Sequence, residues 1–265
     1  MTGKFPESES EAMPGPTSHP RIVGFIPARA QSTRYPGKPL ADILGRPMIM
    51  WVFNRSRRSP MLDDAYVATD SPEILDAVHR CGGKAILTST EHPTGTDRVA
   101  EAARSVGLAA SDIAVNIQGD QPLMDPTMID EVVRPVLDDP TIPMSTLIYR
   151  IVRDEEVHHP NAVKTVFDRQ GFALYFSRAT IPYYRDDLSA TLYYKHHGIY
   201  AYRNDFLQHF ATLPHGGLEQ SERLEQLRAL EHGFRIKVVV TDKDSIEVDT
   251  HEDLQRVREE ASKMD

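Results

Sequence analysis

Short apolar runs alternate with segments of helical length from residue 21 to about residue 137, and this alternation constrains the fold more than any other feature. The first run, IVGFIPA (22–28), is rich in β-branched residues and predicts a buried strand that Pro27 ends. Strands separated by helices form a mostly parallel sheet with helices on both faces. The pattern therefore predicts an α/β fold. The further strands are expected at 65–69, 84–88 and 113–117, and the helices at 48–57, 71–83, 94–107 and 125–137.

The pattern changes after residue 143. Four strand-like segments follow one another with few helices between them, which is typical of an antiparallel or mixed section. We expect a protruding mixed lobe within about 143–203, followed by a helix at 218–233, a strand at 235–240 and a last helix after Thr250. The four strand-like segments are 143–152, 162–168, 172–177 and 192–203.

Residues 1–20 hold four prolines and three alternating glutamates with hardly any apolar side chain. This composition predicts a disordered tail at 1–20, so the folded domain is expected at 21–265. The tail also lacks the apolar segment of a secretory signal, and Cys81 is the only cysteine. These features favour a reducing compartment, the cytoplasm.

The charge and hydropathy of the chain exclude two classes of partner. No apolar run approaches the roughly 20 residues that span a bilayer, so we expect no membrane span. The formal net charge of −9 disfavours a general affinity for nucleic acid. An anionic ligand would therefore need a local basic site.

Such a basic site follows the first strand. The loop at 26–40 contains Arg29, Arg34 and Lys38, with Ser32 as a hydroxyl donor, and has no acidic residue. Ligands of open parallel sheets bind beyond the carboxyl ends of the strands, and three cations there suit a polyphosphate. The loop has neither the P-loop nor the dinucleotide-binding glycine pattern. The residues alone leave open a solvated basic loop without a ligand.

Two aspartates each follow a strand-like run. Asp120 ends NIQGD and Asp249 ends IEVD. Carboxylates at strand ends offer the hard oxygen ligands that Mg²⁺ prefers. The alternative is that each aspartate caps the following helix or turn.

A series of motifs from about residue 22 to the C-terminus resembles one enzyme family, the CMP-Kdo synthetases (3-deoxy-manno-octulosonate cytidylyltransferases). The resemblance implies a Rossmann-like nucleotide-diphospho-sugar transferase fold. It also implies Mg²⁺-dependent transfer of CMP from CTP to the anomeric hydroxyl of Kdo or its 8-amino analogue, for lipopolysaccharide synthesis, by a homodimer joined through the aromatic-rich mixed lobe. QGDQPL and DSIEVDT are most similar to the branch that acts on the 8-amino analogue. The motifs are IPAR..STR.PGKPL, VATDSPEI, GGKAILTS, GTDR, NIQGDQPL, ALYFSRATIP, YKHHGIYAY, LEQLRALE and VDTHEDL.

The resemblance also assigns roles to residues. Lys38, Arg34, Asp120 and Asp249 are implied to be catalytic, and the two aspartates to bind the metal. The implied CTP-binding residues are Ala28, Arg29, Ser32, Arg34, Lys38, Gly95, Thr96 and Arg98. The implied sugar-binding residues are Gln118, Arg178, His196, Tyr200, Glu225 and Gln226. No general base is assigned.

Three of the implied sugar-binding residues also have structural interpretations that need no ligand. Separately, three features of the sequence depart from the family pattern. Gln118 could close a turn, Tyr200 could pack in the core and Glu225 could lie on a solvated helix face. Gln121 stands where the family usually has Glu, and His197, at a usually apolar position, is interpreted as a packing or lobe-surface residue. The segment before LEQLR also differs.

The alternative functions are another sugar nucleotidyltransferase, such as a sialic-acid cytidylyltransferase, and a catalytically silent nucleotide-binding protein. The C-terminal motifs disfavour the first. The presence of both aspartates and both basic residues of the implied catalytic set disfavours the second.

Overall fold

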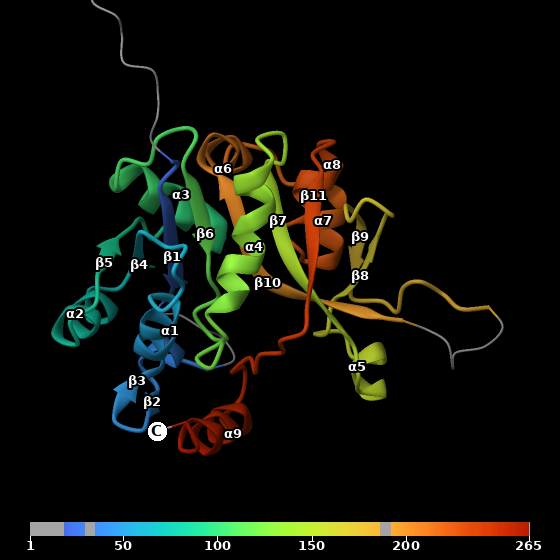
Figure 1. Cartoon of the computed structure of the whole chain (residues 1–265). Helices are drawn as coiled ribbons and strands as arrows, with labels where there is room; N and C mark the ends of the chain where they lie inside the picture. The colour runs from blue at the N-terminus through green and yellow to red at the C-terminus, as the bar shows by residue number, and fades with distance from the viewer. Residues whose placement is uncertain (1–18, 30–34, 186–191, 265) are drawn as a thin grey trace, which may run out of the picture.

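The computed structural model describes residues 19–29, 35–185 and 192–264, so most of the expected tail at 1–20 lies outside the described residues. In this part of the chain a nine-stranded sheet has the order β11-β7-β10-β6-β1-β4-β5, with β8 and β9 joined to β10 (Figure 1). The strands are β1 (Ile22–Ala28), β4 (Asp64–Thr69), β5 (Ala85–Leu87), β6 (Ile113–Asn116), β7 (Met144–Arg150), β8 (Lys164–Phe167), β9 (Ala173–Ser177), β10 (Tyr194–Arg203) and β11 (Ile236–Thr241).

The predicted mostly parallel sheet is confirmed. Strand β1 pairs in parallel with β4 and β6, β4 with β5, and β7 with β11. Strand β10 runs antiparallel between β6 and β7 and makes the sheet mixed. The first strand continues through Pro27 to Ala28 rather than ending at the proline.

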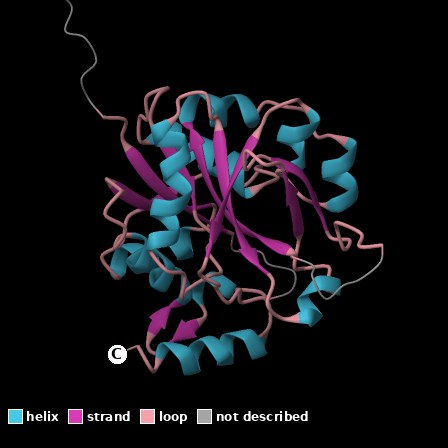
Figure 2. Ribbon diagram, turned by 45° about the vertical axis from the view of Figure 1, so that its right-hand side comes forward, coloured by secondary structure: helices cyan, strands magenta, loops and turns pink. Residues whose placement is uncertain are grey.

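Helices cover both faces of the sheet (Figure 2). One face packs against α1 (Met48–Ser56), α2 (Pro72–Arg80) and α4 (Thr127–Asp138), with Val115 and Ile117 in that core. The other face packs against α3 (Gly95–Ser105), α6 (Asn204–Phe210) and α8 (Leu227–Glu231), with Phe25 and Ala114 buried between them. None of the helices within the described ranges is long and apolar enough to cross a membrane.

The last helix, α9 (His251–Ala261), forms a small third core with the hairpin of β2 (Asp42–Ile43) and β3 (Arg46–Pro47). Ile43 and Val248 are fully buried there against Leu254 and Val257. This packing holds the C-terminal segment beside the loop that follows β1 (Figure 1).

The segment expected as a mixed lobe divides between two places. Strand β7 and most of β10 are part of the central sheet, whereas β8, β9 and α5 (Asp154–His158) extend beyond it. Strand β10 pairs with both β6 and β7 along residues 200–202, so this stretch lies inside the sheet.

The single helix expected at 218–233 is wrong. The chain forms α7 (Gly217–Glu222) and α8, separated by Arg223 in a left-handed conformation with φ of 52°. The Glu222 carboxylate accepts hydrogen bonds from the Ser177 hydroxyl and the Arg178 amide, which fixes the break against the end of β9.

Candidate functional site

The site lies where the neighbouring parallel strands β1 and β6 end. Lys38 begins a single 3₁₀ turn, η1 (Lys38–Leu40), in the loop after β1, and Asp120 lies in the loop after β6. A Cβ atom at Gly119 would approach the Pro27 carbonyl oxygen to 2.9 Å. Glycine therefore lets the Asp120 loop close onto β1.

The Lys38 ammonium group is held by three oxygens. Its Nζ donates to Asp120 Oδ2 at 2.8 Å and to the Val248 carbonyl oxygen at 2.7 Å, and lies 3.4 Å from Asp249 Oδ1. Burial by itself lowers the pKa of Lys38, but the two carboxylates outweigh this effect and raise the pKa above its usual value. Lys38 is therefore a fixed, fully charged cation at neutral pH.

Asp249 reaches this point by a route that the sequence did not predict. Strand β11 ends at Thr241, and the following segment to Asp249 is irregular rather than a strand. The Val248 amide donates to the Asp120 carbonyl oxygen at 2.9 Å, which places the two aspartates side by side.

The cap of the following helix is supplied by other residues. Thr250 is the N-cap of α9 and forms a capping box with Asp253, whose carboxylate also accepts from the Asp249 amide. The Asp249 side chain lies instead next to Lys38. The metal-ligand interpretation of Asp249 thus fits this geometry better than the capping one.

The oxygens around Lys38 also have the chemistry of a magnesium site. Asp120, Asp249 and the Val248 carbonyl converge on one point that a cation already occupies. No cluster of three or more His, Cys, Asp or Glu residues suited to a metal occurs in the described part of the chain. Mg²⁺ is usually held by one or two carboxylates together with waters and substrate phosphates. The residues present therefore fit this metal.

The expected nucleotide residues gather only in part. Arg29 and Gly95 line a cavity of about 350 Å³ together with Thr94 and Glu225. Arg29 is anchored there by a hydrogen bond to the Pro93 carbonyl at 3.0 Å. Ala28 is buried at the end of β1. Ser32 and Arg34 lie outside the described residues.

Arg98 and Thr96 face inward instead of toward an open cavity. Arg98 is fully buried and donates to Asp70 at 2.7 Å and to the Thr88 hydroxyl at 2.6 Å, which ties the ends of β4 and β5 to α3. The Thr96 hydroxyl accepts from the Asn116 side chain at 3.1 Å. Both side chains therefore hold the N-terminal half of α3 against the neighbouring strand ends.

Four of the expected sugar-binding residues lie around the end of β6 and the neighbouring part of β10. Gln118 donates to the Gly198 carbonyl, beside the irregularity in β10. His196 shares a hydrogen bond of 2.9 Å with Thr146, and its ring is tilted against that of Tyr200, with 5.3 Å between the centroids. Burial lowers the pKa of His196 to about 3 and raises that of Tyr200 well above its usual value, so both are neutral. Glu225 accepts from the Thr94 hydroxyl at 3.0 Å, which rules out the solvated helix face.

Arg178 has backbone partners, and Gln226 directly follows Glu225. The Arg178 guanidinium donates to the carbonyls of Glu222 and Pro160 at 2.7 and 3.0 Å. It thus braces the break between α7 and α8 in this structure. Gln226 is buried, and its Nε2 has no hydrogen-bond partner within the described residues.

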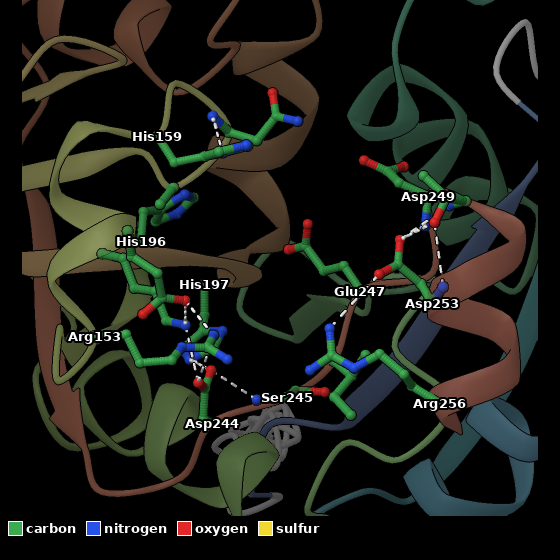
Figure 3. Close-up of a pocket in the computed structure, with 16 residues that line it drawn as sticks. Arg153, His159, His196, His197, Asp244, Ser245, Glu247, Asp249, Asp253 and Arg256 are labelled. Atoms are coloured by element: carbon green, nitrogen blue, oxygen red, sulfur yellow. Dashed lines mark hydrogen bonds and ion pairs between the residues drawn. The ribbon is translucent and has the colours of Figure 1, made fainter. Parts of the chain in front are cut away.

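A cavity of about 480 Å³ opens beside Asp249 and extends to α5 (Figure 3). Its wall includes Lys195, whose Nζ contacts Glu156 Oε1 at 2.8 Å and Asp244 Oδ2 at 2.9 Å. Sequence reasoning missed this cluster, whose members lie far apart in the chain. The available signal was a charged residue, Lys195, within a strand-like segment and directly before His196-His197.

Two residues that depart from the family pattern, Gln121 and His197, lie near this cavity: His197 lines it, and Gln121 bonds the lining residue Glu247. Gln121 is buried and donates to Glu247 Oε1 at 3.1 Å. Desolvation of its carboxyl group and the negative charges of Asp120 and Asp249 raise the pKa of Glu247 to about 7. His197 is buried against Tyr149, consistent with the predicted packing role, and its ring also lines the cavity.

Comparisons with known proteins identify the family. A family model described as cytidylyltransferase matches residues 23–244. A 3-deoxy-manno-octulosonate cytidylyltransferase of Syntrophus aciditrophicus (strain SB) is 59% identical over 90% of this chain and 96% of its own length. An 8-amino-3,8-dideoxy-manno-octulosonate cytidylyltransferase of Shewanella piezotolerans (strain WP3 / JCM 13877) is 51% identical over 88% and 95%. A solved CMP:2-keto-3-deoxy-manno-octonic acid synthetase complexed with CTP is 41% identical, with a TM-score of 0.86 over 92% of this chain and 99% of that one.

Proposed function

This chain belongs to the cytidylyltransferase family, and we propose that it transfers CMP from CTP to the anomeric hydroxyl of 3-deoxy-manno-octulosonate or its 8-amino analogue. The observation that carries the proposal is the convergence of Lys38, Asp120 and Asp249 at the carboxyl ends of β1 and β6. One fixed cation and two carboxylates in one place suit a reaction between two anionic substrates.

In the proposed reaction the anomeric oxygen forms a bond to the α-phosphorus of CTP. The bond from that phosphorus to the oxygen that bridges to the β-phosphate breaks, pyrophosphate leaves, and the hydroxyl proton passes to solvent. Negative charge grows on the departing pyrophosphate, and Lys38 is placed to stabilise it without reorganising. Arg29, with Ser32 and Arg34 of the same loop, is proposed to hold the triphosphate.

Asp120 and Asp249 are the residues that would hold Mg²⁺. When bound, the metal supplies positive charge that offsets the repulsion between the triphosphate and the sugar carboxylate. In this structure the Lys38 ammonium group bridges the two carboxylates and offsets part of their negative charge.

The sugar acid is proposed to lie between this centre and β10. Gln118, His196 and Tyr200 offer neutral hydrogen-bonding groups there. Glu225 is proposed to contact the sugar as well, and its bond to Thr94 fixes it to the start of α3. Arg178 and Gln226 complete the set from the α7–α8 junction. The start of α3, with Gly95 and Thr96, is proposed to recognise the cytosine base together with Ala28. Arg98 is proposed to support this segment.

Assembly and location complete the proposal. We infer a homodimer through the segment that extends beyond the sheet, where Leu174 and Tyr183 are 62% and 88% exposed. The activity would supply an activated sugar for lipopolysaccharide synthesis in the cytoplasm. A monomeric mass in solution at micromolar concentration would contradict the dimer.

The proposed activity has a direct assay. The protein is incubated with CTP, Mg²⁺ and either sugar acid, pyrophosphate release is followed, and the CMP-sugar is identified by mass. We expect release that requires a sugar acid and falls when UTP or ATP replaces CTP. No release with either sugar would contradict the proposal.

A further inference from the structure

The end of the 480 Å³ cavity that lies away from Asp249 is a strongly polar chamber. We define the far end of the cavity by Arg153, Glu156, Lys195, His197, Asp244 and Ser245. Figure 3 shows Arg153, His197 and Asp244 on one side of the cavity and Asp249 on the opposite side. A volume of about 480 Å³ is within the range of small-molecule sites.

The two cations of the far end are already paired. Lys195 contacts Glu156 and Asp244, and Arg153 forms a second ion pair with Glu156. Lys195 also lies over the Tyr149 ring, 5.2 Å from its centroid. The far end therefore offers no unpaired cation among its members to attract the carboxylate of a sugar acid.

Three polar atoms of the far end, in contrast, make no hydrogen bond within the described part of the chain. Glu156 Oε2, His197 Nε2 and Ser245 Oγ are all buried. Asp244 Oδ1 lies 3.7 Å from His197 Nε2, which is beyond hydrogen-bond distance. His197 is only 3% exposed. A buried polar atom without a hydrogen-bond partner destabilises the fold, so three such atoms in one cavity point to a ligand that supplies the missing bonds.

The chemistry of these atoms defines that ligand. Burial lowers the pKa of His197 to about 4, so the ring is neutral, and the ring also bonds the Lys243 backbone. With its proton directed to that backbone, His197 Nε2 is an acceptor. Glu156 Oε2 is also an acceptor, and the Ser245 hydroxyl can accept as well as donate. The far end thus matches a group that donates hydrogen bonds.

We propose that the far end binds the terminal donor group of the sugar acid, a hydroxyl in Kdo and an ammonium in the 8-amino analogue, through His197, Ser245 and Glu156. The inference rests on the proposed function, because Asp249 at the opposite side of the same cavity marks the reacting end. It assigns His197, which departs from the family pattern, a role in sugar selection.

The test compares three acceptors with CTP: Kdo, its 8-amino analogue and its 8-deoxy analogue, which has no terminal donor. In His197→Leu, we expect KM for the first two to rise about tenfold, the effect of one lost hydrogen bond, with kcat within about twofold. KM for the 8-deoxy analogue stays within about twofold of the wild-type value. His79→Leu, an exposed histidine of α2, is the matched control and leaves all three values unchanged.

Ser245→Ala is the second variant, because it removes an unpartnered hydroxyl and leaves packing intact. An equal KM change for all three acceptors, or no change in either variant, would overturn the proposal. If His197→Leu does not fold, the same criteria apply to Ser245→Ala alone. Wild-type protein that turns over none of the acceptors would instead contradict the proposed function itself.

Discussion

The Val248 amide donates a hydrogen bond to the Asp120 carbonyl oxygen over 2.9 Å, and this contact joins the C-terminal segment to the loop after β6. The next residue, Asp249, thereby comes to lie beside Asp120 at Lys38. The site is therefore assembled by backbone pairing between distant segments, and the side chains complete it.

Asp249 and Asp253 are close in sequence but have different roles, so they form a matched pair. We expect Asp249→Asn to lower kcat at least about 100-fold and to raise the Mg²⁺ concentration needed for half-maximal rate, with the thermal midpoint nearly unchanged. Asp253→Asn loses the capping box of α9 and about 1 kcal/mol of stability, with kcat within about threefold. A loss of stability in both variants without a change in the Mg²⁺ response would contradict the metal assignment.

Gly119→Ala tests the close approach of the Asp120 loop to β1. The added methyl group would meet the Pro27 carbonyl oxygen, so we expect a loss of about 1–3 kcal/mol in unfolding free energy and a lower kcat. Gly217→Ala is the control, since the nearest atom to its Cβ is 4.0 Å away. Urea titration and pyrophosphate release measure the two effects, and equal behaviour of the two variants would refute the packing argument.

Arg178→Met tests whether Arg178 stabilises the α7–α8 junction or contacts the sugar directly. The guanidinium donates to backbone carbonyls at the α7–α8 junction, so we expect a loss of about 2 kcal/mol together with a higher KM for the sugar and an unchanged KM for CTP. Arg169→Met, at an exposed position, serves as the control. Unchanged stability with a higher sugar KM would show instead that Arg178 contacts the sugar directly.

Stability should fall as the pH drops below about 6.5. The pKa values of His196 and His197 are lowered to about 3 and about 4, so the unfolded chain binds more protons than the folded one below the ordinary histidine pKa. Each histidine then contributes a loss on the order of 1 kcal/mol per pH unit. Urea titrations between pH 7 and 5 measure this slope. Glu247, whose pKa is raised to about 7, acts in the opposite direction and offsets part of the slope. His197→Leu should lower the slope by the contribution of one histidine, and a slope equal to that of the wild type would contradict the buried neutral state.

Local patterns predicted most of the regular elements. The β-branched run at 22–28 became β1, and the helices expected at 71–83 and 94–107 became α2 and α3, which Ser71 and Thr94 cap. Lys38 and Asp120 lie in the loops that follow β1 and β6, as their positions in the sequence indicated, and their functional roles stay predictions. Such features depend on neighbours in the sequence, so a single chain reveals them.

The remaining features depend on contacts between distant segments. The break at Arg223 is fixed by Glu222 against the end of β9, and the apolar pattern of 218–233 carried no sign of it. Asp249 follows an irregular segment whose backbone hydrogen-bonds to Asp120. Arg98 is buried and hydrogen-bonded to Asp70 and Thr88. Contacts of this kind join residues that are far apart in the sequence, so a single sequence does not reveal them.

The most direct test of the account concerns Lys38, and it compares pyrophosphate release at saturating CTP, sugar acid and Mg²⁺ in the wild type and in Lys38→Met. Lys263→Met is the control, because that lysine side chain is 66% exposed and lies in the C-terminal turn. The account predicts that Lys38→Met lowers kcat at least about 100-fold while circular dichroism shows an intact fold, because a preorganised charge at the leaving group is lost. A folded Lys38→Met protein whose kcat equals that of Lys263→Met would contradict the account.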